Sequence, residues 1–187
     1  MSIDLNSKLQ IKATMKFIEP PIWRRFTIPA RKTLEELHDA IQVMFSWDDY
    51  HLRQFTIGRK KYGLPDPDEL FEIIDLDDSQ FELHQVIQKE EQKFKYVYDF
   101  GDNWEIDLKV EKILESSPRE KYAICLEGKR NAPPEDVGGA PGYEEFLQAI
   151  SDPTNDMHDE LLEWIGGEFD PEAFDLQTIN ELLKELG

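Results

Sequence analysis

Strict alternation of apolar and polar residues is the feature that most constrains how this chain of 187 residues can fold. In residues 11–17 every second side chain is apolar, and the same period of two recurs in residues 22–28, 94–98 and 104–110. This spacing is typical of a strand with one buried face. The sequence therefore predicts a sheet with one apolar face, built around these strands.

Turn residues show how these strands are connected. Glu19-Pro20-Pro21 interrupts the alternation and predicts a hairpin between the first two strands, with Arg24 pointing inward. The motif Tyr-Asp-Phe-Gly-Asp-Asn-Trp (98–104) joins the other two strands. The simplest interpretation of its centre is a hairpin loop, in which Gly101 is free to adopt a positive φ. We also expect strands at 52–57 and 122–126 and a turn at 58–61.

Apolar residues at helical spacing predict helices in two parts of the chain. Thr33 and Glu36 form a capping box at the start of the first helix, which leaves His38 on the side that faces water. The later segment 131–143 holds three prolines and three glycines, so it must be irregular. Helices are expected beyond it, with apolar faces at 143–150 and 157–165 and with caps at Asp170-Pro171 and Asp175.

The order of these elements argues for an α+β fold rather than a parallel doubly wound sheet. We expect an antiparallel sheet with one packed helix, compatible with a β-grasp-like core, and a helical C-terminal portion. A chain of this length can bury a sufficient core by itself. We therefore treat residues 1–187 as a single domain, with a sheet-plus-helix core at 1–130 and a loop and helical portion at 131–187.

Charge is distributed unevenly along the chain. Residues 1–61 hold 11 Lys and Arg against 7 Asp and Glu, which gives +4, whereas residues 62–187 hold 10 against 33, which gives −23, so the acid of the second part causes the net charge of −19. Such a chain repels phosphate backbones and anionic membrane surfaces, which makes nucleic acid a poor first expectation. Because the sequence shows no signal segment and no apolar run of about 18 residues, we expect a soluble cytoplasmic protein.

Four carboxylates form the first candidate site. Asp99 and Asp102 lie in the hairpin loop, and Glu135 and Asp136 lie in the irregular segment. If the two loops meet, these acids could coordinate a hard cation or share protons. Acids in turns also accept hydrogen bonds from neighbouring backbone amides, and we favour this bracing role.

Other patterns carry less chemistry. The acidic connection 65–80 superficially resembles a calcium loop but lacks the required glycine and closing glutamate. No nucleophile elbow and no phosphate-binding glycine loop occurs. Cys125 is the only cysteine, which excludes an intrachain disulfide. The histidines are scattered and have no nucleophilic context: His38, His51, His84 and His158.

Basic residues near strand ends and turns could form an anion-binding patch from Arg24–Arg25, Arg31–Lys32 and Arg59–Lys61. The abundant carboxylates of the second part of the chain offer these residues partners. We favour such pairing, with Arg24 bidentate to an acid inside the fold.

Four segments of the chain can also be read together: PIWRRFTIP, LHDAIQVMFSWDDYHLRQF, YVYDFGDNWEIDL and CLEGKRNAPPEDVGGAPGYEEFL. Their order and wording resemble the plasmid pRiA4b ORF-3-like family, from about residue 8 to the C-terminal helix. The match is specific because four separate segments agree. The family has no established biochemical activity, so the resemblance implies no reaction.

The resemblance implies a metal site that this chain does not keep. Many members carry three cysteines and a histidine at positions that match Cys125, Ala132, Val137 and Ile106 here, a set suited to tetrahedral zinc. Only Cys125 is retained, and the three replacements are apolar. We expect the four positions to meet in space, with hydrophobic packing in place of a metal.

These observations favour a non-enzymatic binding or interaction module, with an unknown protein or small-molecule partner and without a cofactor or metal. The expected binding residues, which match the family motifs, are Asp99, Asp102, Trp104, Glu135 and Asp136. The alternative is a cation-dependent, hydrolase-like activity at the carboxylate cluster. Nucleic-acid association through the basic residues is a third interpretation.

Overall fold

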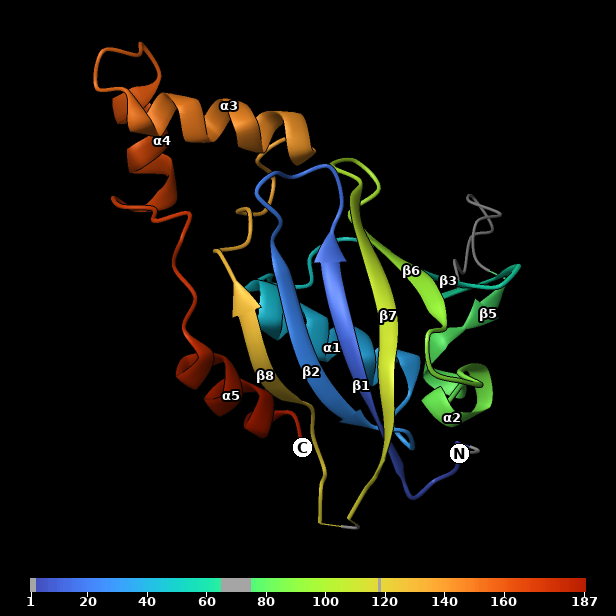
Figure 1. Cartoon of the computed structure of the whole chain (residues 1–187). Coiled ribbons are helices and arrows are strands. Elements are labelled where there is room, and N and C mark those ends of the chain that lie inside the picture. The colour runs from blue at the N-terminus through green and yellow to red at the C-terminus, as the bar shows by residue number, and fades with distance from the viewer. Residues whose placement is uncertain (1–2, 65–74, 118) are drawn as a thin grey trace.

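The strands form one sheet in the computed structural model, which describes residues 3–64, 75–117 and 119–187 (Figure 1). Their order across the sheet is β5-β4-β3-β6-β7-β1-β2-β8, so the two hairpins expected from alternation lie side by side. Residues 65–74 of the expected acidic connection lie outside the described part. The strands are β1 (Ser7–Met15), β2 (Trp23–Pro29), β3 (Arg53–Ile57), β4 (Lys60–Gly63), β5 (Leu76–Asp77), β6 (Lys93–Tyr98), β7 (Trp104–Glu115) and β8 (Ile124–Lys129).

Alternation decides which face of the central strands is buried. In β1 the side chains of Leu9, Ile11 and Ala13 are fully buried, while the residues between them are partly exposed. Strand pairing continues this face across the sheet, because Ile11 lies opposite Phe26 of β2 and Val110 of β7. The apolar face predicted from the sequence is therefore the face of the sheet that packs into the hydrophobic core.

Helix α1 (Leu34–Phe45) lies behind the central strands and completes this core (Figure 1). Its predicted capping box is present: Thr33 Oγ1 accepts a hydrogen bond from Glu36 N at 3.1 Å, and the Glu36 carboxylate accepts one from Thr33 N at 2.8 Å. Two short elements follow β5: a 3-10 turn (Asp78–Gln80) and α2 (Leu83–Val86).

The expected sheet architecture is wrong, although the α+β class describes the structure. The sheet has eight strands in the described residues and is mixed, because β5 runs parallel to β4. More than one helix also packs, since α5 (Leu176–Glu185) lies against α1 and β8. Alternation could not reveal the two outermost strands at this edge, because β4 has four residues and β5 has two.

The C-terminal helices differ in how they are packed. Helices α3 (Gly139–Ser151) and α4 (His158–Ile165) contact each other and project from the body of the protein (Figure 1). We call residues 138–167 the α3–α4 arm. None of the helices in the described ranges is long and apolar enough to cross a bilayer.

The two caps expected near the C-terminus have different outcomes. Asp175 caps α5 as predicted, because its carboxylate accepts hydrogen bonds from the backbone amides of Gln177 and Thr178. The expected helix at Pro171 is wrong. Asp170 instead accepts a hydrogen bond from Glu172 N in a turn, so the Asp-Pro pair shapes a connection.

Candidate functional site

The loop between β6 and β7 is closed by its own residues. Asn103 N donates to Asp99 O at 2.6 Å, and the Asp99 carboxylate accepts a hydrogen bond from Gly101 N at 2.8 Å. The left-handed φ angles fall on Asp99 (54°) and Asn103 (55°), so the expectation that Gly101 supplies one is wrong. Gly101 leaves room for the Asp99 carboxylate, since a Cβ would lie 3.1 Å from its oxygen.

The irregular segment meets this hairpin loop at its glycine pair. Gly138 N donates to the Asp102 carboxylate at 3.0 Å. Gly139 has φ +68°, and a Cβ on it would lie 2.4 Å from the backbone oxygen of Asp102. Only a residue without a Cβ allows the two backbones to approach this closely. The glycines therefore set the contact from which the α3–α4 arm begins.

Glu135 joins the same irregular segment to the residues after α1. Its carboxylate accepts hydrogen bonds from Asp48 N at 3.1 Å and from the Tyr98 hydroxyl. Burial, and secondarily the hydrogen bond to Glu135, raises the pKa of the Tyr98 phenol well above its usual value. The hydroxyl therefore stays protonated and donates to the carboxylate.

Trp104 lies in the core beneath this junction, with 2% of its surface exposed. Its ring centroid is 6.2 Å from that of Trp47, whose indole N–H donates to the Pro133 backbone oxygen at 3.1 Å. The Trp104 Nε1 atom has no hydrogen-bond partner within the described chain. In this conformation Trp104 supports the junction from below and presents little surface to a ligand.

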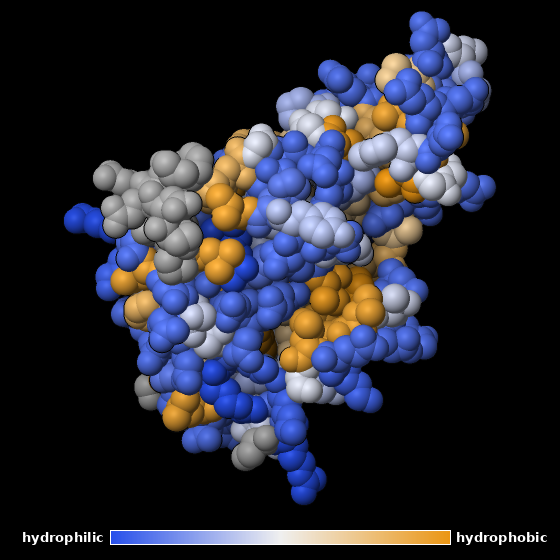
Figure 2. Space-filling model, turned by 180° about the vertical axis from the view of Figure 1, so that it is seen from behind, coloured by the Kyte–Doolittle hydropathy of each residue, from blue (hydrophilic) through white to orange (hydrophobic). Residues whose placement is uncertain are grey.

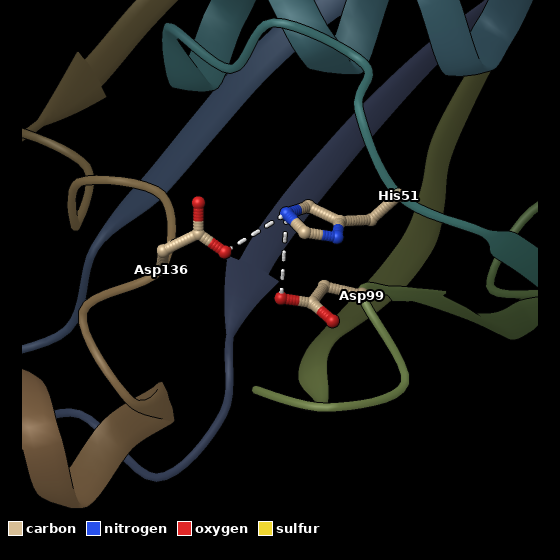
Figure 3. A group of neighbouring side chains, drawn as sticks. All are labelled: His51, Asp99 and Asp136. Atoms are coloured by element: carbon tan, nitrogen blue, oxygen red, sulfur yellow. Dashed lines mark ion pairs between the residues drawn. The ribbon is translucent and has the colours of Figure 1, made fainter.

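Asp99 and Asp136 gather with a third residue, His51, which lies between α1 and β3 (Figure 3). The Nε2 atom of His51 is 3.1 Å from an Asp136 carboxylate oxygen and 3.8 Å from an Asp99 carboxylate oxygen. One donor atom from each residue lies within 4.8 Å of the others. The Asp136 side chain is 68% exposed and that of His51 is 28% exposed, so solvent reaches the cluster.

The four predicted acids thus fall into two groups. Asp102 and Glu135 accept hydrogen bonds from backbone amides of other segments, as a bracing role requires. Asp99 accepts a backbone hydrogen bond within its own loop, from Gly101 N, and shares His51 with Asp136. Sequence reasoning set His51 aside because the residues that approach it are far away in the chain. The one signal was its place in the segment that matches the family.

A buried polar network that the sequence did not reveal lies next to this junction. His38 was expected to face water, but its side chain is fully buried. Its Nδ1 atom is 2.7 Å from the Tyr96 hydroxyl and its Nε2 atom is 2.8 Å from an Asp49 oxygen. The Asp49 carboxylate can only accept from His38 Nε2, so Nδ1 accepts from the Tyr96 hydroxyl, which in turn accepts from the Gln42 side chain. The proton of neutral His38 therefore sits on Nε2 and points to Asp49.

The charge state of His38 follows from its surroundings. Burial, and secondarily the charge of Arg53, lowers the pKa of His38 to about 3. Arg53 is itself buried, and its guanidinium pairs with the fully buried carboxylate of Asp78 at 2.8 Å. The histidine is therefore neutral at physiological pH, and its role in this network is structural.

The four positions of the cysteine–histidine set do not all converge. Cys125 pairs with Phe26 and is level with Val110, whereas Ile106 is four residues further along β7. Three strand spacings separate Cys125 from Ile106, which amounts to about 14 Å across the sheet. The expectation that the set meets in space is wrong for this pair. Burial raises the pKa of the Cys125 thiol to about 11, so it stays protonated.

The basic residues of the N-terminal third are largely engaged. Arg24 points inward as predicted, with 2% exposure, but the predicted bidentate pairing with an acid is wrong. Arg25 pairs with Glu111 at 2.6 Å, as expected for a cation of this region. Arg24 donates instead to the backbone oxygens of Met44, Trp23 and Lys129.

A groove of about 540 Å³ lies between α3 and α4. Phe146 is buried in it and meets Trp164 edge to face at 5.9 Å, whereas Trp164 and Met157 remain about half exposed. Hydrophobic groups are visible between hydrophilic ones on the projecting arm (Figure 2). Acidic side chains complete the lining: Asp136, Glu145 and Glu160.

Comparisons with known proteins agree on the family and name no activity. The family model for plasmid pRiA4b ORF-3-like protein matches residues 7–178. An uncharacterised protein, y4hQ, from Sinorhizobium fredii is 35% identical over 182 residues, which cover 96% of this chain and 92% of y4hQ. The crystal structure of MM3350, a protein of unknown function from Methanosarcina mazei Go1, is similar with a TM-score of 0.81 and 35% identity. That match covers 93% of this chain and 98% of MM3350.

Proposed function

The chain belongs to the plasmid pRiA4b ORF-3-like family, and from that premise we propose that it is a non-enzymatic interaction module. Its docking surface is the groove of the α3–α4 arm. The occupant is a basic amphipathic helical segment of a partner protein. Such a segment places large apolar side chains on one face and Lys or Arg on the other. A cytoplasmic location is part of the same proposal.

One observation carries this proposal: none of the residues of α4 is buried. The helix contains Leu161, Trp164 and Ile165 at helical spacing: Leu161 and Ile165 are only partly buried, and Trp164 is 48% exposed. An amphipathic helix is normally stabilised by burying its apolar face. An exposed apolar surface rimmed by polar residues is typical of a protein interaction site.

Charge identifies the partner class. No Lys or Arg occurs between Arg130 and Lys184, and the arm contains seven carboxylates. A second copy of the same arm would place like charges against each other, which opposes self-association. A basic segment would meet complementary charge at the rim and speed up encounter. The acids are Glu144, Glu145, Asp152, Asp156, Asp159, Glu160 and Glu163.

The groove can take anchor side chains of such a segment. Its volume of about 540 Å³ falls within the range of about 300–1,000 Å³ typical of ligand sites. The half-exposed Trp164 and Met157 offer aromatic and flexible contacts, residue types enriched at protein interfaces. We therefore expect one or two Leu-sized or aromatic anchors to supply most of the affinity.

The test uses a fluorescent synthetic peptide of about 20 residues with Leu at helical a and d positions and Lys elsewhere. Fluorescence anisotropy measures its binding to the full-length protein. We expect Trp164→Ala to weaken binding at least tenfold, because an exposed aromatic anchor is lost. A peptide with Glu in place of Lys should not bind.

The matched control is Leu182→Ala, which truncates an apolar side chain of α5 with 44% exposure. It should leave the dissociation constant unchanged. Equal binding by Trp164→Ala and the parent protein would overturn the proposal, and so would equal weakening by the two variants. Far-UV circular dichroism confirms that both variants are folded.

A further inference from the structure

We infer that His51, Asp99 and Asp136 form a binding site for one divalent transition-metal ion such as Zn²⁺ or Co²⁺. The site shares Asp136 with the lining of the groove proposed as the docking surface, whereas His51 and Asp99 are not part of that lining. The three side chains come from three different segments: the connection after α1, the β6–β7 hairpin loop and the irregular segment (Figure 3). A shared ion would therefore join parts of the chain that are distant in sequence.

The distances between the donor atoms suit one ion. Metal bonds to imidazole nitrogen and carboxylate oxygen are about 2.0–2.2 Å, so two ligands on one ion lie about 3–4 Å apart. His51 Nε2 lies 3.1 Å from Asp136 and 3.8 Å from Asp99, within this range. The Asp136 side chain is mostly exposed, so a rotation can bring its oxygen closer to Asp99.

The hydrogen bonding of His51 is the second observation that points to a cation. Its Nε2 atom is buried and has no aligned hydrogen bond to any residue in the described ranges, although two carboxylates approach it. Within the same ranges no Lys or Arg pairs with Asp99 or Asp136. One buried ring nitrogen and two carboxylates without a cationic partner are the surroundings that a divalent ion neutralises.

The ligand types define which metal fits. An imidazole and two carboxylates suit Zn²⁺ or Co²⁺ with one or two positions left for water. Calcium prefers six to eight oxygen ligands, which this cluster does not offer. The cluster shares no residue with the four cysteine–histidine positions, although one of them, Val137, directly follows Asp136. The chain would therefore bind metal through other residues than those that the family resemblance implied.

The test is isothermal titration of Co²⁺ into the metal-free full-length protein, together with the visible absorption spectrum of bound Co²⁺. We expect one equivalent to bind, with absorption bands of nitrogen and oxygen ligation. His51→Ala and Asp136→Asn should each weaken binding at least tenfold, since each removes one of three ligands. Asp99 is left intact because it also closes the hairpin loop.

Two controls keep this result separate from the docking proposal. Asp107→Asn removes an exposed carboxylate of β7 outside the cluster and should bind Co²⁺ like the parent protein. Trp164→Ala should also bind Co²⁺ normally. Absence of binding to the folded parent protein would overturn the inference, and so would unchanged affinity in both cluster variants.

Discussion

The buried charges of this protein are stabilised by partners that are distant in sequence. Arg53 is 4% exposed and its guanidinium contacts both carboxylate oxygens of Asp78, at 2.8 and 3.3 Å. A carboxylate left without its cation in the interior is strongly unfavourable. The sequence could not indicate this pair, because Asp78 belongs to the acidic connection expected at 65–80 and is one of several acids expected at its surface.

Arg53→Met should lower the free energy of unfolding by about 3–5 kcal/mol, because it leaves the Asp78 carboxylate buried and unpaired. Urea denaturation measures the loss. The control is Arg25→Met, which breaks the partly exposed pairs with Glu111 and Glu127 and should cost about 1 kcal/mol or less. Similar losses in the two variants would contradict the assigned role of burial.

His38 should make stability depend on pH. Its pKa is lowered to about 3 by burial and Arg53, whereas the unfolded chain binds a proton near pH 6.5. Between these values the unfolded state holds more protons, so stability falls as pH decreases. From pH 6.5 to pH 5 the expected loss from this residue is about 2 kcal/mol.

The comparison is between the parent protein and His38→Gln in urea denaturation at pH 7 and pH 5. Burial raises the pKa of Asp39 to about 6, so this residue makes stability rise as pH decreases, opposite to the effect of His38. Asp39 is present in both proteins, so its contribution cancels in the comparison. The variant should lose about 2 kcal/mol less than the parent protein on acidification. Parallel losses would show that His38 is not held neutral in the folded state.

Some helices and strands are determined by neighbouring residues in the sequence, and others by pairing with distant residues. The capping box of α1 was predictable because Thr33 and Glu36 are three residues apart. The α+β class was predictable because alternation marks the long central strands. Strands β4 and β5 were not, since each is short and their pairing spans the residues between 63 and 76. Local sequence patterns therefore predicted the central strands of the sheet but not the strands at this edge.

The contact between the hairpin loop and the arm can be tested at Gly139. Gly139→Ala should lower the free energy of unfolding by about 1–3 kcal/mol more than Gly58→Ala, because of overpacking against the Asp102 backbone. Both glycines have nearly the same φ, +68° and +64°, but a Cβ at Gly58 meets nothing within 4 Å. Thermal or urea denaturation of the pair measures the difference, and equal stability would exclude a tight contact.

At the scale of the whole molecule, the candidate site could be predicted only in part. Asp99 and Asp136 could be predicted from the sequence, because carboxylates in two irregular loops are candidates for cation binding or for hydrogen bonds to the backbone. It did not supply His51, because three segments must fold together before the cluster exists. The arm was predictable as helices, but the absence of buried residues in α4 depends on which surfaces the rest of the chain leaves uncovered.

Hydrogen–deuterium exchange of the full-length protein measures whether the α3–α4 arm docks a basic amphipathic segment. Exchange is measured with and without a saturating amount of the Leu- and Lys-containing peptide. We expect slower exchange of the amides of α3 and α4, with no change in the central strands β1 and β7. Protection confined to the sheet, or no protection anywhere in the arm, would contradict it.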